Sequence, residues 1–173
     1  MTVPHFRAEP LSRREIREQA HAFRHKLGLD NEKYIDVLFL VENVLPAIFP
    51  GFCVEVLPAS QMGNCHGLTP INANKIQIRE DVYEGAYFGR GRDRFTIMHE
   101  VWHYLTLYNH AVGFARCAPG EEIPTYCDPE WQANVFAGEF LMDSNIIRNM
   151  SVEQIAEECG VSYQAARIQK SKI

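Results

Sequence analysis

Residues 93–105 read DRFTIMHEVWHYL, and within them His99-Glu100-Val101-Trp102-His103 form the pattern HExxH. Two histidines four positions apart project from the same face of a helix, so both imidazoles can bind one metal ion. Glu100 lies one position further round the helix, close enough to act on a water molecule bound to that metal. The apolar residues around the motif predict a buried helix from about Asp93 to Tyr108. A core helix with two hydrogen-bonded histidines is the structural alternative.

A catalytic zinc site requires a third protein ligand and one position left open for water. The metzincin pattern would continue with glycine at position 106 and histidine at position 109. The chain has Thr106 and Asn109 there, which excludes that class of metal site. The third ligand is therefore expected on a later element, where acidic residues are the candidates.

Helical spacing favours Glu130 as the third ligand. Asp128 followed by Pro129 predicts the start of a helix that reaches about Met142, with Glu130 in its first turn. Glu139 is nine residues further on, which corresponds to about 900° and places it on the opposite side of the same helix. Three other acidic residues lie in or beside a loop and remain weaker candidates: Glu121, Glu122 and Asp128.

The N-terminal part of the chain predicts two helices. Ser12 and Glu15 form a capping box, and apolar residues then recur at helical spacing until Gly28 provides a stop. A second helix is expected to begin near Asn31 and to end at Pro46. Because this second helix is apolar nearly all round, we expect it to be largely buried.

The middle of the chain predicts a short sheet. Residues 52–57 have strand composition, and residues 75–79 alternate polar and apolar side chains as a half-buried strand does. The stretch between them, residues 60–74, is rich in glycine, proline and asparagine and is expected to form turns. Two short helices around Gly160 complete the chain. The order of helices, a short sheet and helices predicts a mainly helical α+β fold.

Composition and charge exclude several classes of protein. The chain has 173 residues, 46% of them hydrophobic, and its net charge is 17 − 22 = −5. A dedicated nucleic-acid binder usually carries a basic surplus, so nucleic acid is not expected as the main partner. The five cysteines are scattered and odd in number, which indicates reduced thiols in a cytoplasmic protein. No export signal is visible, and the longest apolar run, residues 37–41, is too short to span a membrane.

Two blocks of the sequence resemble the ImmA/IrrE-type zinc metallopeptidase family. Residues 93–105 are similar to that family's RFTLAHELGHYLL, and residues 130–142, EWQANVFAGEFLM, are similar to its ExEANxFAAELLMP. The resemblance continues into the tail and covers most of the chain from about Lys75 onward. The family's glycine before the second histidine is Trp102 here, and the proline after its LM pair is Asp143. Neither departure removes a ligand.

The resemblance implies a zincin-like core, with residues 1–173 as one metallopeptidase domain and residues 150–173 as a helix-turn-helix-like C-terminal subdomain. It also implies that His99, His103 and Glu130 bind Zn²⁺, a gluzincin-like set with glutamate as the third ligand, and that Glu100 is the general base. Zinc so held lowers the pKa of a bound water, and Glu100 takes up the proton of that water. An extended substrate segment is expected to pair with the strand Lys75–Arg79.

The family's role implies a zinc-dependent endopeptidase that cleaves a helix-turn-helix transcriptional repressor and so relieves repression. No DNA-binding domain precedes the peptidase motifs, so the repressor is expected to be a separate protein. The alternative is a regulatory protein that keeps the metal site but sequesters its partner without cutting it. The presence of Glu100 favours the enzyme, because a sequestering protein has no need of a general base.

Several weaker signals have more ordinary interpretations. We expect Arg90, Arg92 and Arg94 to form a solvated turn with Asp93 as counter-charge, although they could dock an acidic partner. Two further groups are also expected to be exposed: His21 with His25 as solvated histidines, and Cys65-His66 as part of a loop. A second donor to the oxyanion is left open among Tyr104, His110 and Tyr126.

The C-terminal helical pair is expected to pack or to dock a protein rather than to contact DNA. Its charged residues cancel, with three cations (Arg167, Lys170 and Lys172) and three anions (Glu153, Glu157 and Glu158). A helix pair that reads DNA should instead carry a positive charge, because phosphate contacts supply most of its affinity.

Overall fold

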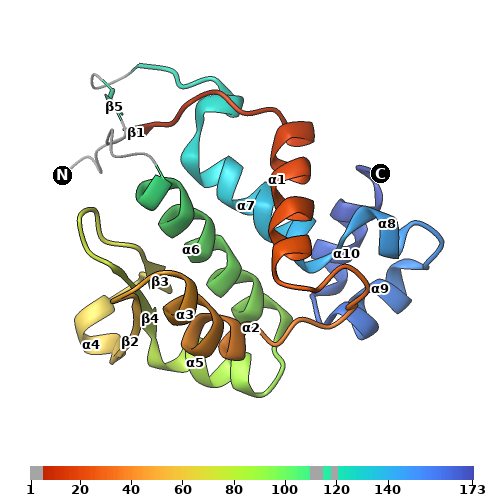
Figure 1. Ribbon diagram of the computed structural model, residues 1–173, viewed down its shortest axis with the longest axis horizontal. Helices are drawn as coiled ribbons and strands as arrows, with labels where there is room; N and C mark the ends of the chain where they lie inside the picture. Colours follow the sequence, from red (N-terminus) through yellow and green to blue (C-terminus); the bar gives the residue numbers. More distant parts are fainter. Residues whose placement is uncertain (1–5, 110–114, 118–120) are drawn as a thin grey trace.

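The two helices that carry the motifs, α6 (Gly91–Asn109) and α7 (Pro129–Leu141), lie side by side and run in opposite directions in the computed structural model (Figure 1). The structure describes residues 6–109, 115–117 and 121–173. Trp102 of α6 stacks on Phe136 of α7 with ring centroids 4.8 Å apart. Ala133 and Ala137 of α7 are fully buried, and their small side chains allow the two helices to approach closely. Asp128 caps α7, as the sequence predicted.

A three-stranded sheet covers one side of α6, with the strand order β2-β4-β3. Strand β2 (Cys53–Leu57) is parallel to β4 (Lys75–Arg79), and β3 (Gly67–Leu68) is antiparallel to β4 on its other side. The expectation that a substrate would pair with Lys75–Arg79 is therefore wrong, because this strand is central. The edge strand of the sheet that contacts α6 is β3. It lies within residues 60–74, the stretch that was expected to form turns.

The remaining elements surround this centre and confirm a mainly helical α+β fold (Figure 1). A second small sheet pairs β1 (Phe6–Arg7) with β5 (Ala115–Arg116). Helix α5 (Glu80–Tyr87), which the sequence analysis did not predict, connects β4 to α6. The short elements are α4 (Ala59–Met62), the 3-10 turn Thr125–Cys127 and α8 (Ser144–Ile147). Among the described residues, no helix combines the length and the apolar character that crossing a bilayer requires.

The second predicted helix starts later and ends later than expected. It consists of α2 (Val37–Phe39), a π-helical turn (Leu40–Val44) and α3 (Leu45–Ile48). Asp36 fixes the start, because its side chain accepts a hydrogen bond of 2.9 Å from the backbone N–H of Phe39. Pro46 does not end the helix, since it lies in the first turn of α3, where a missing N–H has little cost. Phe39 is 57% exposed, so the burial of this segment is also less complete than predicted.

Helix α1 (Arg13–Lys26) packs across α7 and carries a buried arginine near its end. The predicted capping box between Ser12 and Glu15 is present. Arg24 is fully buried and donates to three backbone carbonyls, those of Phe140, Leu29 and Glu32. Its Nε also lies 3.6 Å from the carboxylate of Asp143. Arg24 therefore connects α1, the loop after it and the end of α7.

The C-terminal pair, α9 (Val152–Cys159) and α10 (Tyr163–Lys170), turns at Gly160, whose φ of 64° requires glycine. Arg94 of α6 is 1% exposed and donates to the backbone oxygens of Gly160 and Cys159. The expectation that Arg94 belongs to a solvated turn is wrong, because its guanidinium satisfies the last carbonyls of α9. Arg90 does pair with Asp93, at 3.1 Å. That residues 150–173 form a helix-turn-helix-like subdomain of their own stays a prediction.

Replacing Arg24 by Met should lower the free energy of unfolding by about 3–5 kcal/mol, because it leaves Asp143 and three carbonyls without their buried partner. The matched control is Arg14→Met, since Arg14 is 86% exposed and pairs with Glu18 one turn away. We expect the control to change the unfolding free energy by less than about 0.5 kcal/mol. Urea denaturation followed by circular dichroism measures both, and equal losses would show that the buried contacts of Arg24 give no net stabilisation.

Candidate metal centre

Three side chains from α6 and α7 converge on one point. The Nε2 atoms of His99 and His103 lie 3.0 Å apart. Each of these nitrogens also lies 3.1 Å from one carboxylate oxygen of Glu130. The three groups form the cluster that the sequence predicted as a ligand set, and in the described part of the chain they are the group of His, Cys, Asp and Glu that could hold a metal.

The spacing of these atoms fits a single zinc ion. Ligand atoms about 2.0–2.1 Å from a tetrahedral zinc lie about 3.3 Å from one another. The observed separations of 3.0–3.1 Å are close to that value. Two imidazole nitrogens and a carboxylate are also the donor types of catalytic zinc sites, in which a fourth position is left for water. The residues present therefore fit the metal.

Asn134 orients the first histidine. Its Oδ1 lies 2.9 Å from Nδ1 of His99, one turn along α7 from Glu130. When Nδ1–H donates to this oxygen, the lone pair of Nε2 is directed at the cluster, as is usual for metal-binding histidines. Asn134 lies four residues after Glu130 and so on the same face of α7, but the sequence analysis did not predict this contact.

Glu100 lies beside the cluster in a buried position. The residue is 6% exposed, and its Oε2 accepts a hydrogen bond of 2.8 Å from the hydroxyl of Thr69. Gly67 of β3 packs directly against it, because a Cβ at this position would lie only 2.7 Å from Cγ of Glu100. Thr69 and Gly67 were missed by the sequence analysis, since nothing in the turn-rich stretch indicates which residues face α6.

The pKa values of the cluster reflect this arrangement. Burial raises the pKa of Glu100, although charge on His103 and His99 and the bond from Thr69 oppose the rise. Burial alone would lower the pKa of His99, but the hydrogen bond with Glu130 and the charge of Glu100 outweigh it and leave that pKa raised. Hydrogen bonds with His103 and His99 hold the pKa of Glu130 well below its usual range. Glu130 is thus ionised, as a metal ligand must be.

The alternative third ligands lie elsewhere. Glu139 is fully buried on the far side of α7, where it pairs with Arg13 at 3.1 Å and with Arg17 at 2.9 Å. Asp128 caps α7 by accepting from the backbone N–H of Glu130 at 3.0 Å. Within the described residues, neither these two nor Glu121 and Glu122 belong to the cluster. Glu130 and Glu139 therefore lie on opposite sides of α7, as their half-turn offset predicted.

Other residues singled out in the sequence are engaged away from the cluster. Tyr104 is buried, and its hydroxyl donates to Asn74 at 2.6 Å. Tyr126 is 52% exposed, while His110 lies outside the described residues. Three others have polar neighbours or are exposed: His21 lies 3.3 Å from Asp143, His25 lies 3.1 Å from Asp30, and Cys65 is an exposed thiol. The second oxyanion donor stays unassigned.

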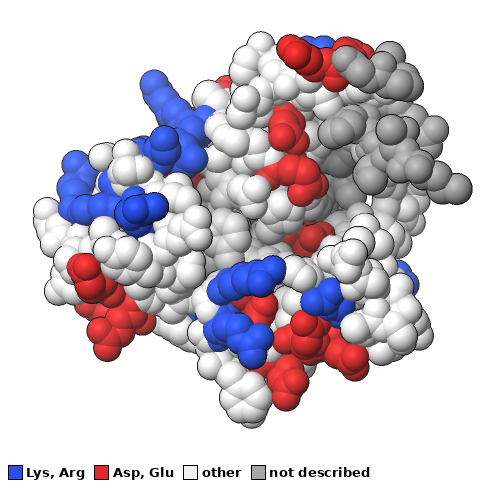
Figure 2. Space-filling view, turned by 180° about the vertical axis from the view of Figure 1, so that it is seen from behind, with Lys and Arg blue, Asp and Glu red and all other residues white. Residues whose placement is uncertain are grey.

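The face that carries the cluster is hollowed and acidic at its centre. Figure 2 shows acidic side chains along a hollow on this face, with basic side chains gathered to the left, towards the C-terminal end of the chain, and further basic side chains beside acidic ones below the hollow. A hollow lined by negative charge raises the local concentration of cations. This distribution of charge is consistent with a cation-binding centre.

Replacing Glu130 by Gln should weaken zinc binding, because it removes the charged ligand, whereas Glu139→Gln should leave the zinc content largely unchanged. The two changes are chemically identical and lie on opposite sides of one helix. Elemental analysis of the purified variants, with competition against a chelator, measures the effect. Loss of zinc from the Glu139 variant alone would mean that Glu139, and not Glu130, is the ligand.

A comparison with protein-family models matches residues 66–169 to the peptidase family M78, described as the IrrE N-terminal-like domain. The match spans β3, the sheet strand β4, both motif helices and most of the C-terminal pair. No curated protein matches the chain significantly. Because the family match covers more than half of the sequence and includes every residue of the candidate metal centre, the chain belongs to the IrrE N-terminal-like peptidase family.

Proposed function

We propose that the protein is a zinc-dependent endopeptidase in which His99, His103 and Glu130 bind the metal and Glu100 is the general base. The observation that carries the proposal is the convergence of the three donor atoms within 4.8 Å of one another, with the buried Glu100 beside them. Membership of a peptidase family supports the reaction class. Zinc bound there would acidify a water molecule and polarise the carbonyl of the scissile peptide bond.

The role of Glu100 follows from its surroundings. Its carboxylate takes a proton from the attacking water and gives it to the leaving amine. Burial raises its pKa, which brings the group closer to the value at which it can both accept and return a proton near neutral pH. The hydroxyl of Thr69 fixes one carboxylate oxygen, so that the other oxygen is free for the water.

The substrate backbone is proposed to pair with β3. This strand is at the edge of the sheet, and Gly67 contacts Glu100, so a strand added there would pass the catalytic base. Leu68 is 47% exposed on the same short strand. An edge strand next to the motif helix is suited to hold an extended peptide rather than a folded helix.

The proposed substrate is a separate helix-turn-helix repressor in the cytoplasm, and its cleavage would relieve repression. This proposal rests on the resemblance of the two sequence blocks to the ImmA/IrrE-type peptidases. Direct contact with DNA or with a membrane is not part of the proposal, since the C-terminal helix pair carries no net charge among its six charged residues. The competing function is sequestration of the repressor without cleavage.

Replacing Gly67 by Ala should lower peptidase activity by about 10²-fold, because the new Cβ would displace Glu100 from its position. Zinc content should stay at one ion per chain, since the atoms nearest to the new Cβ belong to Glu100, which is not a proposed ligand. Initial rates on a casein or peptide substrate, with zinc analysis of the same sample, measure this effect. Full activity of the variant would show that the position of Glu100 against β3 does not matter for the reaction.

Replacing Glu100 by Gln separates the two functions. Zinc binding and the fold should be preserved, because Glu100 is not a proposed ligand. A general base contributes about 10²–10⁴-fold, so cleavage of the repressor should nearly vanish, and relief of repression with it. The measurements are the length of the repressor on a gel and the output of a reporter gene.

A sequestering protein would give the opposite result, because the change from Glu to Gln hardly alters the surface that a partner contacts. If the Glu100 variant relieves repression as well as the parent chain while the repressor stays full length, the peptidase function is excluded. The matched control is Glu122→Gln, a neutralisation of the same kind outside the metal cluster.

A further inference from the structure

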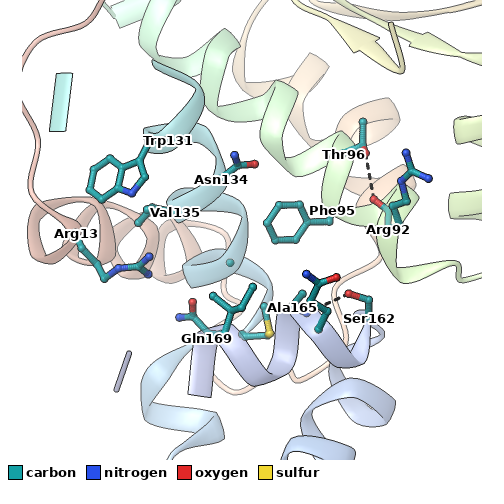
Figure 3. Close-up of a pocket in the computed structure, with 14 residues that line it drawn as sticks. Arg13, Arg92, Phe95, Thr96, Trp131, Asn134, Val135, Ser162, Ala165 and Gln169 are labelled. Atoms are coloured by element: carbon teal, nitrogen blue, oxygen red, sulfur yellow. Dashed lines mark hydrogen bonds between the residues drawn. The ribbon is translucent and has the colours of Figure 1, made fainter. Parts of the chain in front are cut away.

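A cavity of about 500 Å³ lies between the first half of α6, the middle of α7, and α10 (Figure 3). Phe95, Val135 and Met142 form much of its apolar wall. None of the four proposed catalytic and metal-binding residues lines it. Its volume lies in the range of about 300–1,000 Å³ that is typical of small-molecule sites. The cavity is therefore a candidate binding site separate from the peptidase centre.

One wall of the cavity presents a buried hydrogen-bond donor without a partner. Gln169 of α10 lines the cavity and is 3% exposed, and its Nε2 has no hydrogen-bond partner among the residues that the structure describes. The amide packs against Gly138, where a Cβ would lie 3.0 Å from Oε1. An unpaired buried donor is unfavourable, because the hydrogen bonds that it made with water in the unfolded chain are not replaced. A ligand with an acceptor oxygen in the cavity would remove this cost.

The charged side chains that line the cavity are both arginines. Among the described residues, Arg13 and Arg92 line it and no acidic residue does. Arg13 and Arg17 share the carboxylate of Glu139, so this group of two cations and one anion keeps one positive charge. Arg92 is exposed and forms no ion pair with any carboxylate in the described part of the chain. The cavity thus favours an anion over a neutral or cationic ligand.

From these observations we infer that the cavity binds a small carboxylic acid with an apolar body. The apolar body packs on Phe95, Val135 and Met142. The carboxylate lies at the end where Gln169 and Arg13 are found together, and it accepts a hydrogen bond from Nε2 of Gln169 (Figure 3). Arg92, at the opposite end in this view, adds long-range attraction. The inference does not depend on the proposed peptidase function.

The test is isothermal titration calorimetry of the full chain with decanoate and with 4-butylbenzoate. Each acid is compared with the alcohol of the same carbon skeleton, so that only the charged group differs. We expect saturable binding of one acid per chain, with each alcohol bound at least about tenfold more weakly, because hydrogen bonds to charged groups are the strong ones. Equal affinity for acid and alcohol would exclude a carboxylate site, and so would the absence of saturable binding by both acids.

Two variants assign the binding to this cavity. Gln169→Met keeps the length of the side chain and removes the donor, so affinity for both acids should fall about tenfold. Its melting temperature should stay the same or rise, since an unpaired buried donor is lost. Ala165→Phe places a ring in the cavity and should abolish binding of acids and alcohols alike. Unchanged acid affinity in the Gln169 variant would overturn the assignment, whether or not the Ala165 variant folds.

A pair of arginines provides the matched electrostatic control. Arg92 lines the cavity, whereas Arg90 is two residues away, pairs with Asp93 and does not line it. Arg92→Gln should weaken acid binding several-fold, and Arg90→Gln should leave it unchanged. Equal effects would show that only the overall charge of the chain matters. A dimer in analytical ultracentrifugation that Arg92→Gln dissociates would identify a second copy of the chain as the occupant and would exclude the small acid.

Discussion

The candidate metal centre depends on the close packing of α6 against α7. The two histidines belong to one helix and Glu130 to the other, so the separations of 3.0–3.1 Å exist only while the helices stay close. Ala133 and Ala137 make this approach possible, because larger side chains at the contact would push the helices apart. Trp102 then fills the space next to the alanines by stacking on Phe136. A tryptophan in place of the family's glycine is thus accommodated by the core and leaves the cluster intact.

Helix α7 presents a different group on each of its sides. Glu130 faces the two histidines, Glu139 faces the arginines of α1, and Asn134 faces both His99 and the cavity beside α10. The second half of the helix, residues 135–141, is buried throughout. Because a buried helix cannot rotate without breaking contacts on all sides, the orientation of each of these groups is fixed by the others. Asn134 thus lies between the candidate metal centre and the cavity, which are otherwise lined by different residues.

The sequence predicted the elements whose signals are local. The capping box at Ser12, the Asp128-Pro129 start of α7 and the turn at Gly160 depend on nearby residues, and the structure has all three. The cluster of His99, His103 and Glu130 was predicted in two steps: helical spacing favoured Glu130 over the other acidic residues, and the family resemblance implied the full set. For the caps and the turn, the evidence lies within one or two turns of a helix.

Features that depend on distant residues could not be predicted in this way. Arg94 looked like one of three solvated arginines, but its guanidinium binds carbonyls of residues 159 and 160. The edge position of β3 depends on which strands pair, which one sequence does not reveal. The contact between Gly67 and Glu100 joins two segments that no local pattern connects. The second helix differs from expectation for local reasons, the cap by Asp36 and the place of Pro46 in the first turn of α3, and α5 was not predicted.

The ion pairs between α1 and α7 show that the part of the chain that must fold together is larger than the part that matches the family. The family match begins at residue 66, yet Glu139 is neutralised by arginines 126 and 122 residues earlier in the chain. A protein shortened to the matched region would hold a buried carboxylate with no counter-ion and would lose the cap that Arg24 gives to the end of α7. The family match covers the part of the chain that holds the candidate metal centre. The part of the chain that must fold together also includes the N-terminal third. Helix α1 supplies the arginines that neutralise Glu139 and cap the end of α7, which the matched region cannot do by itself.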